Sequence, residues 1–126
     1  MPSSTPLSQR ASVASYPRKV ALIGAPTDVG TSTLGAAMGP DALRVAQLGP
    51  ALQRLGLEVH DMGNLAGPIN PQGRRDPAHG NLRNLTECAI WNKTVFDAIN
   101  TQFRRGRMPI LMGGDHHLSI GSISAA

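Results

Sequence analysis

The side chains best suited to chemistry lie together in the segment Met112–Gly121, which reads Met-Gly-Gly-Asp-His-His-Leu-Ser-Ile-Gly. This segment follows a short apolar run that is typical of a buried strand, and open α/β sheets bind ligands at the carboxyl ends of such strands. Two consecutive glycines permit a sharp turn, so that an acid and an imidazole emerge together. An imidazole there can bind a metal or transfer a proton, although a catalytic metal normally takes at least three protein ligands. The spacing alone leaves a functional histidine and a hydrogen-bonded structural histidine both open.

A second candidate segment, Gly24–Ser32, reads Gly-Ala-Pro-Thr-Asp-Val-Gly-Thr-Ser and follows the apolar run Val20–Ile23. Glycine-rich turns after a first strand can bind phosphate through backbone N–H groups. The segment has neither the Lys-Ser/Thr ending of a P-loop nor the spacing of a dinucleotide fingerprint. We therefore favour a structural role, in which glycines permit a tight path over the sheet edge, and keep a phosphate-binding module as an alternative.

Three strands must position these segments, and we predict them at Val20–Ile23, Leu57–Asp61 and Pro109–Met112. The first and third are continuous apolar runs, as in buried parallel strands, whereas the second alternates apolar with polar residues, as strands near a sheet edge do. Helical patterns separate the strands, which favours one parallel sheet. The predicted fold class is α/β, with an irregular surface connection over residues 63–81.

Gly39-Pro40-Asp41 predicts a helix start, because proline suits the first turn and a carboxylate there faces the positive end of the helix dipole. Two short helices should follow before Gly56, the first with Leu43, Val45 and Ala46 along one face, the second with Leu52 and Leu55. The longest predicted helix starts at Asn84, with Asn84 and Glu87 as a capping box, and stops at Gly106. Its apolar stripe comprises Leu85, Cys88, Ala89, Val95, Phe96, Ile99 and Phe103. A further helical stripe begins at Leu118.

Length and composition limit the possibilities. With 126 residues the chain suits one domain, and with 3% aromatic residues its core must be mainly aliphatic. Residues 1–18 contain no acid and no clear apolar stripe, so we expect a disordered arm, with a transit peptide as the alternative, before a domain over residues 19–126. Three strands with few covering helices indicate an incomplete sheet, so we expect a fragment of a longer protein.

The same composition excludes several classes of function. The single cysteine, Cys88, excludes an internal disulfide framework and a cysteine-based zinc site. No apolar run is long enough to span a membrane. The net charge of +4 comes from dispersed basic residues with few aromatics to stack on bases, so we expect a solvated surface and no nucleic-acid partner.

Three segments of the chain resemble the ureohydrolase family, and within it the arginases. They are Ile23–Pro26 with Gly30 and the helix start Gly39–Arg44, then Asp61–Leu65, and finally Gly113–His116 followed by Leu118–Ser124. The Gly-Gly-Asp-His segment with its Ile-Gly-Ser continuation is the most specific of these. The agmatinase branch shares the first and last segments. The resemblance therefore favours arginase over agmatinase only through the residues Ile-Gly-Ala-Pro in the first segment and Gly-Asn-Leu in the second.

The resemblance implies a three-layer α/β/α fold, incomplete in this chain, and hydrolysis of L-arginine to L-ornithine and urea. The implied cofactor is a pair of manganese ions that hold the attacking hydroxide, a role that suits a Lewis-acidic metal. The implied metal ligand is His116. A cytoplasmic location, a small-molecule substrate and a homo-oligomer of the complete enzyme are also implied.

The remaining residues of the family's site, including the Asp-Ala-His-x-Asp segment, would fall after Ala126. We therefore expect no catalytic residue in this chain, which by itself should be inactive. Asp115 is expected to fix the turn or orient His116. His117 is assigned no metal role and is expected to be an exposed lining of the crevice. A non-catalytic remnant remains an alternative.

Overall fold

The computed structural model describes residues 18–71, 75–76, 80 and 82–126, so the expected arm lies outside the described residues except for Arg18. Its centre is a parallel sheet in the order β2-β1-β5. Strand β1 (Lys19–Ala25) lies between β2 (Glu58–Asn64) and β5 (Met108–Gly113). The register pairs Val20 with Val59 on one side and with Met108 on the other. The three predicted strands and their parallel arrangement are confirmed, as is the placing of the second strand at an edge of this sheet.

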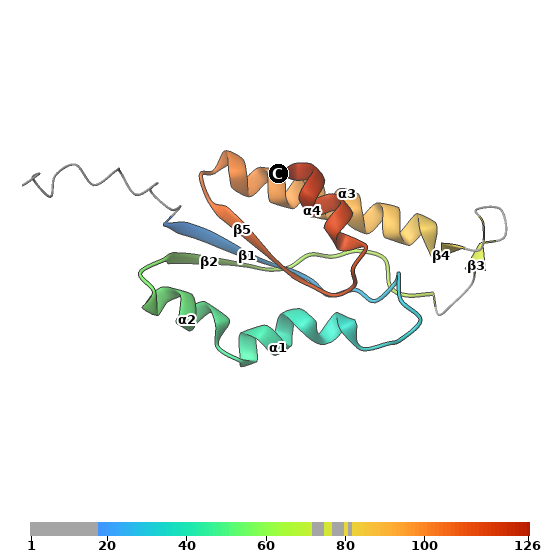
Figure 1. Cartoon of the computed structure of the whole chain (residues 1–126), viewed down its shortest axis with the longest axis horizontal. Helices are drawn as coiled ribbons and strands as arrows, with labels where there is room; N and C mark the ends of the chain where they lie inside the picture. The colour runs from blue at the N-terminus through green and yellow to red at the C-terminus, as the bar shows by residue number, and fades with distance from the viewer. Residues whose placement is uncertain (1–17, 72–74, 77–79, 81) are drawn as a thin grey trace, which may run out of the picture.

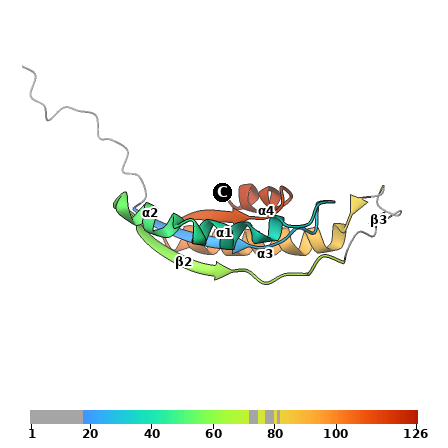
Figure 2. The same ribbon diagram turned by 90° about the horizontal axis from the view of Figure 1, so that it is seen from below.

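Helices cover both faces of the sheet and give three layers. Helices α1 (Gly39–Val45) and α2 (Leu48–Arg54) lie on one face, and α3 (Leu85–Arg104) and α4 (Leu118–Ala125) lie on the other (Figure 1). Figure 2, seen from below, has α1 and α2 in front of the strands and α4 towards the β5 edge. A short 3-10 turn, η2 (Ala36–Met38), leads into α1. The predicted α/β/α layering is therefore present, around a partial sheet.

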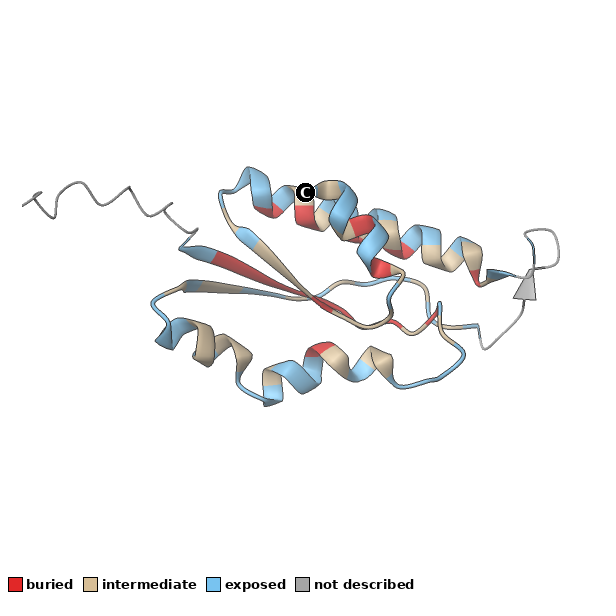
Figure 3. Ribbon diagram, in the orientation of Figure 1, coloured by how far each residue is buried: buried red, intermediate tan, exposed pale blue. Residues whose placement is uncertain are grey.

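The core lies between β1 and α3. Strand β1 is buried from Val20 onwards because it has a neighbouring strand on each side and helices over both faces (Figure 3). Helix α3 contributes Val95 and Ile99, as predicted, and also Trp91, whose indole N–H donates to the carbonyl of Pro68 over 2.8 Å. Phe96 and Phe103, which were expected in the buried stripe, are 37% and 38% exposed. The buried face of α3 is therefore narrower than its apolar pattern suggested.

The apolar faces expected for the two short helices are largely exposed, and only Leu52 among the residues of those faces is partly buried. Leu43, Val45 and Leu55 are exposed, and Val45 is 80% exposed. In α1 the buried residue is instead Pro40, and one turn later Arg44 is half-buried. Positions four apart share one face of a helix. Helix α1 therefore uses a proline ring and the stem of an arginine where apolar side chains were expected.

The capping box predicted for α3 is also absent. Asn84 does stand at the N-cap, but its backbone is left-handed, with φ 48°, and its side chain makes no capping hydrogen bond. Its amide instead donates to the carbonyl of Val29 over 2.7 Å and to the side chain of Asn70 over 3.3 Å. A bond to the loop after β1 has replaced the local bond to the helix.

The connection before α3 is not wholly irregular. Two-residue strands β3 (Arg75–Asp76) and β4 (Leu82–Arg83) pair antiparallel within residues 63–83. Among the described helices, none has the length and apolar character needed to cross a lipid bilayer.

Candidate functional site

The candidate site is the turn of residues 114–117, which joins the carboxyl end of β5 to the start of α4. Gly114 has φ 89°, and a Cβ there would lie 2.6 Å from the carbonyl oxygen of Ala25 and 2.7 Å from that of Thr27. Only glycine fits at this position without displacing backbone. The Gly113–Gly114 peptide bond is cis. The turn is therefore held against the carboxyl end of β1, the place at which parallel sheets bind ligands.

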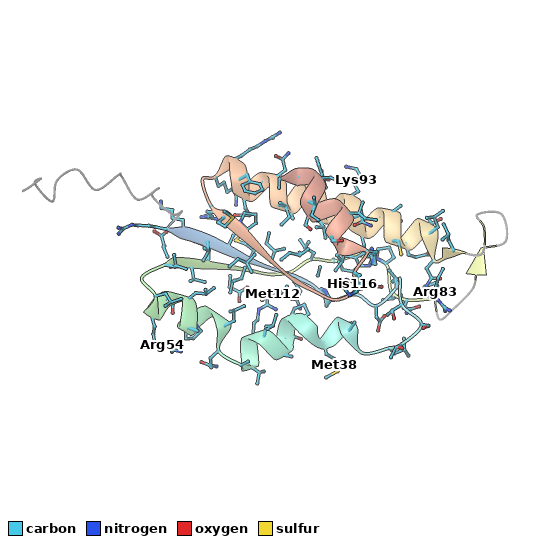
Figure 4. The ribbon with its side chains drawn as sticks, viewed as in Figure 1. Met38, Arg54, Arg83, Lys93, Met112 and His116 are labelled. Carbon is cyan, nitrogen blue, oxygen red and sulfur yellow. The ribbon has the colours of Figure 1, made fainter. Side chains whose placement is uncertain are left out.

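His116 projects from this turn (Figure 4). It is exposed, and its imidazole makes no hydrogen bond within the described part of the chain. Its backbone carbonyl accepts a hydrogen bond from the hydroxyl of Ser119 over 2.8 Å. The residue borders a hollow of about 290 Å³ that Leu111, Leu118 and Ser122 also line. The backbone at His116 is thus anchored while both ring nitrogens remain available to a ligand.

The two neighbours of His116 in the sequence are residues of intermediate burial with largely buried side chains. The side chains of Asp115 and His117 are 8% and 11% exposed, so the expectation that His117 is an exposed lining of the crevice is wrong. One oxygen of Asp115 accepts from the backbone N–H of His117 over 3.5 Å, which is consistent with the expectation that Asp115 fixes the turn. Burial lowers the pKa of His117, and the nearby Asp115 carboxylate opposes this effect. The imidazole packs inward because α3 offers it a polar partner.

That partner is Asn92, which the sequence analysis did not single out. Its side-chain nitrogen lies 3.2 Å from Nδ1 of His117, and its oxygen accepts from the backbone N–H of Gly121 over 3.0 Å. A signal for this contact was present in the sequence. Asn92 lies four residues after Cys88 and three before Val95, on the core-facing side of the predicted helix, where a polar residue needs a partner.

The described residues contain no group of three His, Cys, Asp or Glu side chains that could hold a metal ion. Asp115 also borders the hollow, but its side chain is only 8% exposed and its Oδ2 lies 3.9 Å from Nε2 of His117. Cys88 is half-buried, and burial raises the pKa of its thiol, which disfavours the thiolate that binds metals. Within this part of the chain, only His116 at the turn has an accessible imidazole, so these residues fit the role of a single ligand within a larger set.

The loop after β1 is poorly suited to phosphate. Several of its backbone N–H groups already have internal acceptors: those of Val29 and Thr33 donate to threonine hydroxyls two residues earlier, and that of Gly35 donates to the Asp28 carboxylate over 3.2 Å. A carboxylate inside such a loop repels an anion. The geometry therefore favours the structural role of these glycines over the phosphate-binding alternative.

A polar cluster beneath the turn holds α1 in place. Nε and Nη2 of Arg44 donate to the two carboxylate oxygens of Asp61 over 2.9 and 3.0 Å, and Nη1 donates to Asn64 over 2.6 Å. The hydrogen bonds from Arg44 hold the pKa of Asp61 below its usual value. At the other end of α1, Gly39 lies directly against the carbonyl of Gly113. The cluster thus ties α1 to β2 and keeps its first residue beneath the candidate site.

Comparison with known proteins matches most of the chain, including the candidate site, to one family. Residues 18–126 match the model of the Arginase family. The chain is 34% identical over 108 residues to the arginase of Bacillus caldovelox, which covers 85% of the chain and 36% of that relative. The crystal structure of that arginase matches with a TM-score of 0.73 at 32% identity, covering 86% of this chain and 36% of that one. A crystal structure of Entamoeba histolytica arginase in complex with L-ornithine matches with a TM-score of 0.72 at 27% identity, covering 86% of this chain and 35% of that one. The chain therefore spans about a third of the length of the relatives it matches.

Proposed function

Because the chain belongs to the Arginase family, we propose that it contributes the amino-terminal, metal-ligating part of an arginase-type ureohydrolase that converts L-arginine to L-ornithine and urea. The observation that carries this proposal is the anchored backbone and accessible imidazole of His116 at the carboxyl end of β5. A cytoplasmic homo-oligomer is part of the same proposal. So is the division into an arm of residues 1–18 and the amino-terminal part of an α/β domain over residues 19–126.

His116 would be one ligand of a pair of manganese ions, through a ring nitrogen. The ions would supply Lewis acidity to activate a water molecule for attack on the guanidinium carbon. Imidazole suits several transition metals, so the preference for manganese rests on carboxylate ligands from outside the described residues. Asp115 supports the turn from the buried side.

The contribution of this chain is to hold the backbone of His116 in position before a metal ion binds. The Gly113–Gly114 turn sets the direction of the backbone, and the Ser119 hydroxyl holds the carbonyl of His116. Helix α4 packs on α3 behind the turn. A backbone that is already in place loses little conformational entropy when the side chain binds a metal, which favours metal affinity.

The metal-ligand role can be tested on the chain itself with Mn²⁺, whose unpaired electrons broaden the NMR signals of nearby nuclei. We expect the ring protons of His116 to broaden at lower Mn²⁺ concentrations than those of His60, which serves as the internal control because its Nε2 is paired with Glu58 over 2.6 Å. Broadening at His60 and not at His116 would argue against the proposed ligand.

The reaction requires the complete enzyme that carries these residues. His116→Ala there is expected to lower manganese content and urea release together, each by at least about 10-fold. Agmatine and L-arginine are compared as substrates, since the agmatinase branch shares two of the three segments. Full metal content and activity in His116→Ala would refute the role, and a preference for agmatine would correct the substrate.

A further inference from the structure

We infer that His117 is a positioning residue for the turn that presents His116, linking Asn92 of α3 to Asp115 within the turn. The inference deepens the proposed function and rests on it for the role of His116. It depends on three observations: the orientation of the Asn92 amide, two buried polar atoms that face each other, and the close cover of this pair by the loop after β1.

The orientation of Asn92 determines which nitrogen of His117 carries the proton. The Asn92 oxygen accepts from the backbone N–H of Gly121 over 3.0 Å, and its nitrogen donates to the carbonyl of Cys88 over 3.0 Å. Exchanging the two atoms would place a donor against a donor and an acceptor against an acceptor. The amide nitrogen must therefore be the atom that faces Nδ1 of His117, 3.2 Å away. Because that nitrogen is a donor, Nδ1 accepts, and the proton of the neutral imidazole is on Nε2.

The Nε2 proton faces a carboxylate. Nε2 of His117 lies 3.9 Å from Oδ2 of Asp115, and both atoms are buried without a hydrogen-bond partner among the residues that the structure describes. One is a donor in the deduced tautomer and the other is an acceptor. A small rotation of either side chain brings them to hydrogen-bond distance, and buried polar groups are nearly always paired in folded proteins. Asn92, His117 and Asp115 then form one chain of hydrogen bonds.

The loop after β1 closes over this pair. A Cβ on Gly30 would lie 2.6 Å from Oδ2 of Asp115 and 2.8 Å from Cδ2 of His117. The absence of a side chain at residue 30 is therefore what lets the loop approach and exclude solvent. Hydrogen bonds are electrostatically stronger where solvent is excluded.

The consequence for His116 follows from its place in the sequence. The side chain before it and the side chain after it are both held in the interior, while its own ring remains outside. His117 thus acts on the candidate ligand through the backbone alone. The chain of bonds also joins the turn to α3 at Asn92, so the position of the ligand depends on the longest helix of the structure.

The tautomer is measured first, on the unaltered chain with ¹⁵N-labelled histidine at neutral pH. We expect His117 to show an unprotonated Nδ1 and a protonated Nε2. Protonation at Nδ1 would overturn the inference without any variant that risks unfolding.

The positioning role is then tested with two variants. His117→Leu keeps the apolar bulk and removes both hydrogen bonds, whereas His117→Asn retains an acceptor for Asn92. We expect His117→Leu to speed hydrogen exchange at the amides of Leu118 and Ser119 by about 10-fold, since these amides donate to the carbonyls of the turn. The Mn²⁺ concentration needed to broaden His116 should rise several-fold in parallel. His117→Asn should restore part of both effects.

His60→Asn is the matched control, because it alters a histidine in β2 whose ring is bonded to Glu58. It should leave the exchange of the turn unchanged. The two proposals fail separately. Absence of Mn²⁺ broadening at His116 in the unaltered chain overturns the metal role, whereas unchanged exchange and unchanged Mn²⁺ response in His117→Leu overturn the positioning role.

Discussion

Replacing Arg44 by lysine is predicted to lower the free energy of unfolding by about 1–2 kcal/mol at pH 7. The guanidinium binds both oxygens of Asp61 and also the side-chain oxygen of Asn64. Lysine keeps the charge but has no planar fork, so it cannot make these bonds together.

The magnitude follows from the exposure of the cluster. Hydrogen bonds to charged groups contribute about 1.5–3 kcal/mol when they are well shielded. Here the side chain of Arg44 is 25% exposed and that of Asp61 is 43% exposed, so solvent screening reduces the sum of the bonds to the range given. In a domain of about 100 residues, each kcal/mol shifts the melting temperature by roughly 4–8 °C. Urea denaturation followed by circular dichroism measures the loss directly.

The pH dependence supplies a sharper test. Because the pKa of Asp61 is lowered in the folded state, its contribution to stability is present above the unfolded value of 3.8 and is lost as the pH falls through the folded value. The difference between the wild-type chain and Arg44→Lys should therefore narrow below about pH 4. Lys93→Ala, which removes an exposed pair with Asp97, is the control and should cost less than about 0.5 kcal/mol. An Arg44→Lys difference that is the same at every pH, or no larger than that of the control, would refute the reasoning.

Three other changes test the site and the core. Gly114→Ala should lower the free energy of unfolding by more than about 2 kcal/mol, since the new methyl group meets two backbone carbonyls. Gly106→Ala is the control in the same denaturation experiment. Gly106 has φ 70° and open space around it, so this variant measures the backbone strain without a steric clash. Trp91→Phe should lower stability by about 1 kcal/mol through loss of the bond to the Pro68 carbonyl, which thermal denaturation would detect. The 126-residue chain with added Mn²⁺ should release no urea from L-arginine, because one exposed imidazole cannot hold two ions, and urea in a colorimetric assay would contradict this.

The strands of the sheet could be predicted because each is marked by a short apolar or alternating run of consecutive residues. The apolar run at Val20–Ile23 is buried between two strands, and the alternating run after Leu57 forms an edge of the described sheet, as a half-exposed strand requires. The run at Pro109–Met112 was expected to be buried in the same way, but only Met112 is buried, because β5 forms the other edge of the described sheet. The position of His116 at the end of a strand was predictable for the same reason. Its ligand role remains a prediction.

Three of the errors share one physical origin, which is polar contact between distant parts of the chain. Asn84 was predicted to cap its own helix, but its amide meets Val29. Helix α1 was expected to have its apolar side chains along one face, but it is held to the sheet by Arg44, which bonds to Asp61. His117 was predicted to be exposed, but Asn92 draws it inward. Helical and strand periodicity reports apolar burial, and it carries no information about which polar side chains meet across elements.

The central place of β1 has a consequence for the order of events during synthesis. Val20 pairs with Met108, so the first strand of the described chain obtains one of its two neighbours only after nearly all of the remaining residues have been made. A nascent chain that has not yet reached α3 carries an apolar strand with one edge unpaired and one face uncovered. Contacts between residues so distant in sequence slow folding and prolong the lifetime of intermediates whose exposed apolar surface favours aggregation. One apolar edge of β1 therefore stays unpaired until the residues of β5 have been synthesised.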